Sequence, residues 1–340
     1  MTDIFCIKIY YNNIINKLLL FNLNIFTETC AEKLIQRNLY KNMRLSEPRD
    51  IKWRERRARR LRTQIRDRKL RKKLVERSRL ERRAEILKIR HVAWLGGTYS
   101  PPTKAHFMVA MEIGKKMALM YPNEICVVSI TPVSHAYKKP SIHKDCVSPE
   151  ARVALVKAMV NSLNEENTYA NLKFVLEYHE LNSQVAVPTI TSLGMLKRKY
   201  FNSTVYISQG QDNVEQIFSR QWVKSNNLIE DFGIIMYPRG DANNSTLKDM
   251  DGALAKALKA PKAQSKGEEF DPYTEPDIRN ILGRVHIIDT NFNDESSSSE
   301  LRKLIRDNNV GKIESMFHPV VFKKYLELKE LYPSMYKMNV

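Results

Sequence analysis

Residues 94–106 have the sequence Trp94-Leu95-Gly96-Gly97-Thr98-Tyr99-Ser100-Pro101-Pro102-Thr103-Lys104-Ala105-His106, and this stretch decides the fold. The apolar segment 91–95 predicts a strand, and the apolar residues of 105–117 recur at helical spacing. The two glycines between them permit a tight turn. A strand, a loop and a helix in this order present unpaired backbone N–H groups and the positive end of a helix dipole, which favour a bound anion. Taken alone, the stretch is explained equally well by an ordinary turn followed by a surface histidine.

Predicted strands and helices alternate through the rest of the chain. Strands are expected at 124–130, 173–176, 205–208, 233–237 and 285–288, and helices at 150–163, 192–200 and 317–331. This alternation predicts an α/β fold with a doubly wound, mostly parallel sheet, whose ligand site lies at the carboxyl ends of the strands. Every candidate motif of the chain directly follows one of these strands.

Four segments, in order, resemble the signatures of the nucleotidyltransferase superfamily that includes the nicotinamide/nicotinate mononucleotide adenylyltransferases. The first resembles the loop Gly-x-x-x-Pro-x-Thr-x-x-His and matches it at Gly97, Pro101, Thr103 and His106. The others are Ile130-Thr131-Pro132-Val133-Ser134-His135-Ala136-Tyr137-Lys138-Lys139, then Gly210-Gln211-Asp212 followed by Trp222, and finally Ser297-Ser298-Ser299-Glu300-Leu301-Arg302. The resemblance covers roughly residues 90–333 and implies a Rossmann-like nucleotidyltransferase fold.

The resemblance implies transfer of AMP from ATP to the 5′-phosphate of nicotinamide or nicotinate mononucleotide, which forms NAD or deamido-NAD plus pyrophosphate. It assigns catalytic roles to His106, Thr103 and Arg302. It assigns ATP binding to Gly97, Thr98, Tyr99, His106, Gly210, Asp212, Ser298, Ser299 and Arg302. It assigns mononucleotide binding to Ser100, Lys138, Lys139, Thr189, Trp222 and Arg239. Donors and cations suit this reaction, because the attacking phosphate is already ionised and needs no general base. Mg²⁺ is expected to bridge the ATP phosphates, with no protein side chain as its ligand.

Two positions depart from the eukaryotic enzymes of the family, and two other functions stay open. Ile190 stands where those enzymes place a tryptophan that stacks on the pyridine, and Gln209 replaces the cysteine before Gly-x-Asp. The chain could therefore be another nucleotidyltransferase with a phosphorylated acceptor. It could also be a nucleic-acid-associated regulatory protein on the same fold.

The net charge of +18 is concentrated in one segment of the chain. Residues 44–90 contain 21 Lys or Arg against 7 Asp or Glu, no glycine and a single aromatic residue, Trp53. This composition predicts a basic helical extension. The extension is either a solvated charged segment or a contact for a polyanion or an import receptor. A nuclear location is expected on the second interpretation, with the cytoplasm as the alternative.

The chain is expected to divide into three parts. Residues 1–43, rich in Asn and Ile, are expected to be poorly structured or a non-native leader, with a targeting peptide as the runner-up. Residues 44–90 form the basic extension, and 91–333 form the catalytic domain. Within that domain, 241–282 is expected to be a surface insertion.

The cysteines and the hydropathy restrict the class of protein further. Cys6, Cys30, Cys126 and Cys146 lack the spacing of a zinc site or a disulfide framework. No apolar run reaches the roughly 18 residues of a spanning helix, so no membrane contact is expected. We expect a homo-oligomer that acts on small nucleotide substrates.

Overall fold

The computed structural model describes residues 48–134, 136, 148–238, 250–259, 272–288, 298–307 and 309–331. These residues form a six-stranded parallel sheet with the strand order β3-β2-β1-β4-β5-β6. The strands are β1 Ile89–Gly97, β2 Ile125–Pro132, β3 Leu172–Leu176, β4 Thr204–Gly210, β5 Gly233–Tyr237 and β6 Val285–Ile287. The order reverses between β1 and β4, as it does in doubly wound nucleotide-binding sheets. The predicted fold class is confirmed.

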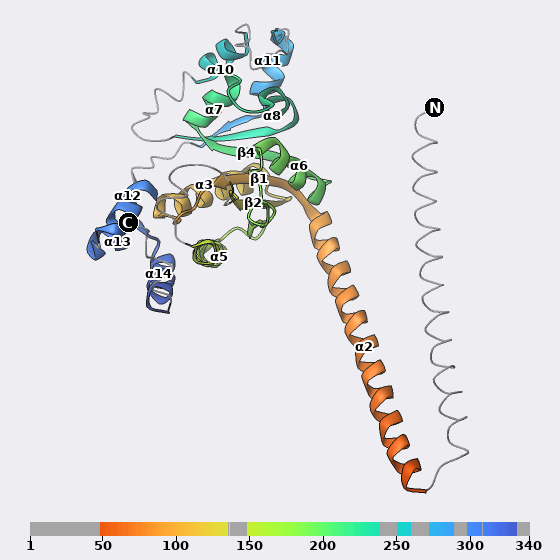
Figure 1. Cartoon of the computed structure of the whole chain (residues 1–340). Helices are drawn as coiled ribbons and strands as arrows, with labels where there is room; N and C mark the ends of the chain where they lie inside the picture. The colour runs from red at the N-terminus through yellow and green to blue at the C-terminus, as the bar shows by residue number, and fades with distance from the viewer. Residues whose placement is uncertain are drawn as a thin grey trace, which may run out of the picture. The chain divides into compact units, whose positions relative to one another are not determined.

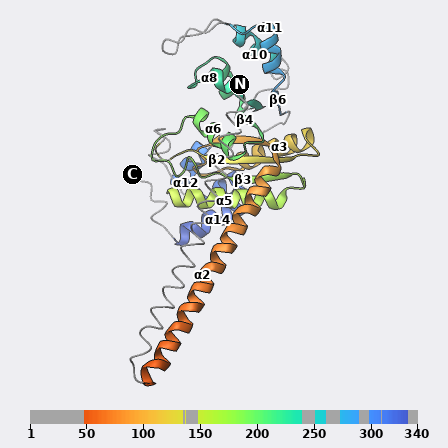
Figure 2. The same ribbon diagram turned by 90° about the vertical axis from the view of Figure 1, so that its right-hand side faces the viewer.

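One face of the sheet is covered by α3 Lys104–Met120, α5 Pro149–Glu166 and the closing helices α12 Ser298–Arg306, α13 Val310–Met316 and α14 Pro319–Leu331 (Figure 1). The other face is covered by α6 Thr189–Lys199, α7 Gln211–Phe218, α8 Ser225–Asp231, α10 Met250–Lys259 and α11 Glu275–Leu282 (Figure 2). Successive residues of β1 point to opposite faces, so Ala93 and Leu95 join the first core and Val92 and Trp94 join the second. The central strand is therefore buried on both sides.

The structure differs from the expected surface insertion at 241–282. Its described parts include helices α10 and α11, and their apolar side chains lie in the second core. Leu254, Leu258, Ile278 and Ile281 are all buried there. Leu254 and Leu258, four residues apart in the alanine- and lysine-rich α10, and Ile278 and Ile281, three residues apart in α11, each have the spacing of one helical face. Residues 241–249 and 260–271 of the predicted insertion lie outside the described residues.

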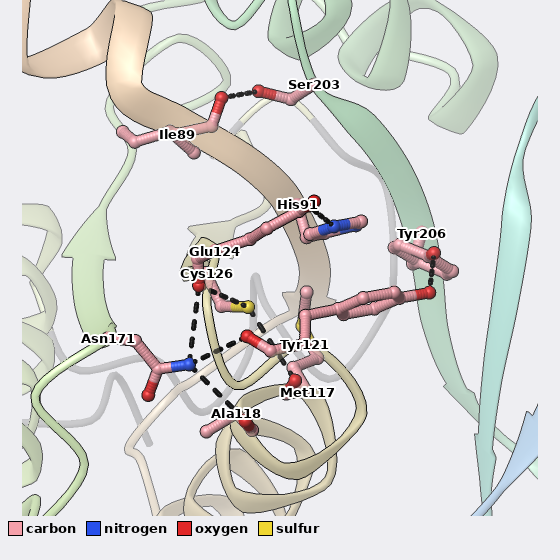
Figure 3. A network of polar contacts seen from close by, with 10 residues as sticks. All are labelled: Ile89, His91, Met117, Ala118, Tyr121, Glu124, Cys126, Asn171, Ser203 and Tyr206. Carbon is pink, nitrogen blue, oxygen red and sulfur yellow. Dashed lines mark hydrogen bonds and ion pairs between the residues drawn. The ribbon is translucent and has the colours of Figure 1, made fainter.

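A polar and aromatic network fixes the amino-terminal ends of the strands (Figure 3). His91 stacks on Tyr121 with ring centroids 3.5 Å apart, and its Nε2 lies 2.5 Å from a carboxylate oxygen of Glu124. The hydroxyls of Tyr121 and Tyr206 are 2.5 Å apart, which links the end of α3 to β4. Asn171 donates to the carbonyls of Ala118, Tyr121 and Glu124. These contacts secure the edge of the sheet opposite to the loop of residues 97–103.

The basic segment contains one long helix, α2 Pro48–Lys88. The chain divides into two compact units, Met1–Leu80 and Glu81–Val340, and the sheet belongs to the second. Residues 1–43, for which a leader was expected, lie outside the described part of the chain. Across the described ranges, none of the helices combines the length and hydropathy that a membrane crossing requires.

Candidate functional site

The loop between β1 and α3 is held in a compact form by Tyr99. The Tyr99 backbone is left-handed, with φ of 46°, and its buried side chain donates from the hydroxyl to the Leu95 carbonyl at 2.9 Å. A Cβ at Gly97 would lie 3.0 Å from the Tyr99 ring, so the ring would have to shift by a few tenths of an ångström to admit a side chain here. Burial, together with the nearby Tyr237, raises the pKa of Tyr99 well above its usual value. Tyr99 is therefore a neutral structural element of the loop.

Thr103 and His106 meet at the start of α3. Thr103 is the residue that precedes the helix, and its backbone N–H donates to His106 Nδ1 at 3.1 Å. The Thr103 hydroxyl lies 2.7 Å from the same nitrogen. Because a backbone N–H can only donate, Nδ1 acts as the acceptor and the ring proton of the neutral form is on Nε2. Thr103 thus sets both the orientation and the tautomer of His106.

The closing segment lies directly against this loop. Ser298 Oγ donates to the Pro101 carbonyl at 3.0 Å, across 197 residues of sequence. Arg302 donates to the Ser100 carbonyl at 2.8 Å and to Ser299 Oγ at 2.8 Å. Only 4% of the Arg302 residue is exposed. The structure therefore brings together two segments that the resemblance assigns to ATP binding, the loop of residues 97–106 and the start of α12.

The starts of α3 and α12 also favour a bound anion through their charge. Helix α3 begins at Lys104 and α12 begins at Ser298, and both starts contact the same loop. Each helix start carries partial positive charge from the helix dipole, and the Arg302 guanidinium adds a full charge at one of them. A buried guanidinium with a planar fork of donors suits a phosphate better than a flexible ammonium would.

The Gly-x-Asp segment ends β4, the strand beside β1. Gly210 precedes α7, and Asp212 is exposed in the first turn of that helix. Gln209, which replaces the family's cysteine, is buried, and its side-chain oxygen accepts a hydrogen bond of 2.8 Å from Asn213. Since β1 and β4 are parallel neighbours, Gly97 and Gly210 end at the same edge of the sheet. The segment is therefore placed as the sequence predicted.

The residues expected at the pyridine lie on the second face. Thr189 begins α6 and is half-buried. Trp222 is half-buried in the connection between α7 and α8, and its indole N–H donates to Gln216 at 3.1 Å. Ile190, in place of a tryptophan, packs against the second core. The contacts of Trp222 and Ile190 are those of packed residues, and the assignment of Thr189 and Trp222 to the mononucleotide stays a prediction.

Some predicted site residues fall outside the described chain. These are Lys138, Lys139 and Arg239, for which the mononucleotide was the expected partner. Where side chains are described, the structure contains no cluster of three or more His, Cys, Asp or Glu residues that could hold a metal ion.

Sequence reasoning missed Arg152, a residue of α5 that is completely buried. Its guanidinium donates to the Thr98 carbonyl at 3.1 Å and to the Val133 carbonyl at 2.7 Å. It thereby ties the loop after β1 to the loop after β2. The signal was present in the sequence, because Arg152 shares a helical face with the buried Leu155 and Met159. A charged residue on an apolar face needs partners, and here the partners are loop carbonyls.

Sequence reasoning also missed Glu180, a residue of the loop after β3 whose carboxyl interacts electrostatically with Arg152. Only 2% of Glu180 is exposed, and burial raises the pKa of its carboxyl to about 7, although a hydrogen bond from Ser192 and the charge of Arg152 act in the opposite direction. His179 Nε2 lies 2.7 Å from Ser192 Oγ, and burial lowers the pKa of the imidazole. Glu180 is therefore expected to change its protonation state near neutral pH, where its charge acts on Arg152, the residue that ties the two loops together.

Neither family models nor curated proteins match this chain. Among solved structures, two of the Plasmodium falciparum nicotinic acid mononucleotide adenylyltransferase are similar, one complexed with APC and one with NaAD. Each is 19% identical over 74% of this chain and 98% of its own, with a TM-score of 0.46. Thermotoga maritima TmcAL bound with alpha-thio ATP is 12% identical over 72% of this chain and 56% of its own, with a TM-score of 0.33. Likeness at this level does not assign an activity, which depends on the residues at the site.

Proposed function

We propose that this chain is a nucleotidyltransferase that moves AMP from ATP to the 5′-phosphate of nicotinamide or nicotinate mononucleotide, releasing pyrophosphate. One observation carries the proposal: Ser298 and Arg302 hydrogen-bond to the carbonyls of Pro101 and Ser100. Two segments that resemble phosphate-binding signatures, far apart in sequence, thus lie in contact at the carboxyl end of the sheet, which supports a single site there. A fold without this chemistry would have no need to place them together.

The chain's residues would act by binding and orienting two polyanions. His106 would donate from Nε2 to an ATP phosphate, because Thr103 occupies its other nitrogen. Arg302 would offset the charge that grows on the leaving pyrophosphate, and its bond to Ser100 keeps the loop in register with α12. The mononucleotide phosphate is the nucleophile, so alignment and charge neutralisation provide the rate enhancement.

The remaining assignments are proposals of the same kind. Gly210 and Asp212 would receive the adenosine, with the carboxylate accepting from ribose hydroxyls. Lys138, Lys139, Arg239, Ser100, Thr189 and Trp222 would receive the mononucleotide. Mg²⁺ would enter with ATP as part of the substrate and would bridge its phosphates. The described residues offer no carboxylate cluster for a separate metal site.

The test is an assay of the purified full chain with Mg²⁺ and ATP. Nicotinamide and nicotinate mononucleotide are offered separately, and NAD, deamido-NAD and pyrophosphate are followed by chromatography. We expect product with at least one acceptor and a loss of about a hundredfold or more in turnover for Arg302→Gln. Lys303→Gln is the matched control, since it removes a positive charge from an exposed position of the same helix. Equal loss in both variants would refute the assigned role of Arg302.

One observation keeps a second candidate open. Ile190 packs against the second core where an aromatic ring was expected, so the acceptor's base would be stacked less fully. A different phosphorylated acceptor is therefore the alternative within the same chemistry. ATP-dependent adenylylation of another phosphate ester, with both pyridine mononucleotides inert, would establish it. A nucleic-acid-associated regulatory protein on this fold is the further alternative, and complete absence of pyrophosphate release with every acceptor would favour it.

A further inference from the structure

Helix α2 has a surface that the nucleotide site does not use. In residues 56–79, twelve Lys or Arg have described side chains, and all twelve are exposed. They are Arg56, Arg57, Arg59, Arg60, Arg66, Arg68, Lys69, Arg71, Lys72, Lys73, Arg77 and Arg79. Asp67 and Glu76 are the acidic residues of this segment, which we call the basic helix segment. Its charge density far exceeds what solubility requires.

The positive charge surrounds the helix instead of occupying one face. At about 100° per residue, neighbouring basic positions around the axis are separated by no more than about 60°. Arg60, Arg68, Lys72, Lys69, Lys73 and Arg77 follow one another in this order around the circumference. A partner that only touches one side of the helix would leave most of these charges unused. The pattern therefore fits a partner that presents negative charge on more than one side.

The apolar residues of the segment exclude two other classes of partner. Leu70, Leu74 and Val75 in the segment, and Leu80 directly after it, are between 53% and 62% exposed, and they point in at least three directions around the axis. A helix that lies on a membrane needs one continuous apolar face, and a coiled coil needs a seam of apolar residues at heptad spacing. Neither pattern is present. Residues 56–88 also contain no aromatic residue on which an unpaired base could stack, which argues against single strands.

We propose that the basic helix segment binds double-helical DNA, with the α-helix lying in the major groove and its Lys and Arg side chains reaching the phosphates of both walls. The major groove of B-DNA is about 12 Å wide and an α-helix with side chains is about 10–12 Å across. The major groove of A-form RNA is too narrow for the same fit. The 24 residues of the segment rise about 36 Å, roughly one turn of the duplex. This inference does not depend on the proposed enzymatic function.

The number of phosphates that the helix reaches sets a measurable salt dependence. A straight helix leaves a curved groove within one turn, so about six phosphates is a reasonable expectation for twelve charges distributed around the axis. Six neutralised phosphates correspond to a slope of about −5 for the logarithm of affinity against the logarithm of salt concentration. Affinity should then fall about a thousandfold between 50 and 200 mM salt. Removal of one phosphate-binding side chain should weaken binding about eightfold at 0.1 M salt.

The experiment uses the full chain and a fluorescent DNA duplex of about 20 base pairs, two helical turns, with binding followed by anisotropy across this salt range. The test variant replaces six charges by glutamine: Arg66→Gln, Arg68→Gln, Lys69→Gln, Arg71→Gln, Lys72→Gln and Lys73→Gln. Glutamine preserves helix propensity, and circular dichroism checks that the helix remains. We expect at least about a hundredfold weaker duplex binding and a shallower slope. The charge-preserving control, Arg66→Lys with Arg68→Lys and Arg71→Lys, should retain both.

Competing ligands distinguish binding in the major groove of DNA from unspecific binding to any polyanion. Double-stranded RNA, single-stranded DNA, heparin and vesicles with about 30% phosphatidylserine are offered under the same conditions. Preference for duplex DNA over all four supports the proposal. Equal or tighter binding of any of them overturns it, as does unchanged binding by the glutamine variant or no duplex binding at 50 mM salt. Adenylyl transfer is measured in parallel and should be the same in wild type and in both variants.

Discussion

Replacement of Glu180 by glutamine should remove a pH dependence from the stability of the folded chain. The carboxyl is 2% exposed, and its pKa is raised to about 7 from an ordinary value of 4.5. Below pH 4.5 the group is protonated in both the folded and the unfolded chain. As the pH rises from 4.5 to 7, the unfolded chain releases the proton while the folded chain retains it. The free energy of unfolding therefore falls across this window and stays low above pH 7.

The magnitude follows from the difference between the two pKa values. About 2.5 pH units correspond to about 3 kcal/mol, which wild type should lose between pH 4.5 and pH 8 through this group. Glutamine mimics the protonated acid and does not titrate. Glu180→Gln should thus be within about 1 kcal/mol of wild type near pH 5 and about 3 kcal/mol more stable at pH 8.

Urea denaturation at pH 5, 6, 7 and 8 measures this effect as the difference between wild type and variant. Other titrating groups, including the neighbouring His179, are present in both proteins and largely cancel in the difference. Glu165→Gln, at an exposed position of α5, is the matched control and should leave the pH profile unchanged. Parallel profiles for wild type and Glu180→Gln would refute the reasoning.

Three further predictions concern the loop. Arg152→Gln removes a buried guanidinium from the carbonyls of Thr98 and Val133, so the free energy of unfolding in urea should fall by about 3–5 kcal/mol; an unchanged midpoint contradicts this. Gly97→Ala places a Cβ 3.0 Å from the Tyr99 ring and should cost about 1–3 kcal/mol. Gly194→Ala, whose Cβ would make only an ordinary 3.8 Å contact with the Arg198 guanidinium within α6, should instead stabilise by about 0.5–1 kcal/mol; equal effects would be inconsistent with this packing. Thr103→Val removes the 2.7 Å contact between the Thr103 hydroxyl and His106. The free energy of unfolding should fall by about 1 kcal/mol, and kcat/KM for ATP should also fall; an unchanged kcat/KM would show that Thr103 has no role in catalysis.

Local patterns predicted most of the secondary structure. The strand expected at 233–237 is observed at those residues, and the one expected at 124–130 is observed at Ile125–Pro132. Strands and helices of this kind depend on periodicity and on nearby turn residues, which a short window of sequence contains. The contact between Thr103 and His106 is local in the same sense, because two residues that are three positions apart at a helix start lie on one face.

Tertiary structure alone decided which segments meet and which charges are buried. No local pattern shows that Arg302 donates to the carbonyl of Ser100, 202 residues away, or that α10 and α11 complete a core. The burial of Arg152 and Glu180 is of the same kind, since it depends on elements that pack over them from elsewhere in the chain. The sequence by itself determined the elements and the residue types that we propose to bind phosphate. Only the folded chain brought the loop and α12 together, because contacts between distant segments come from packing of the whole sheet and not from any one segment's preferences.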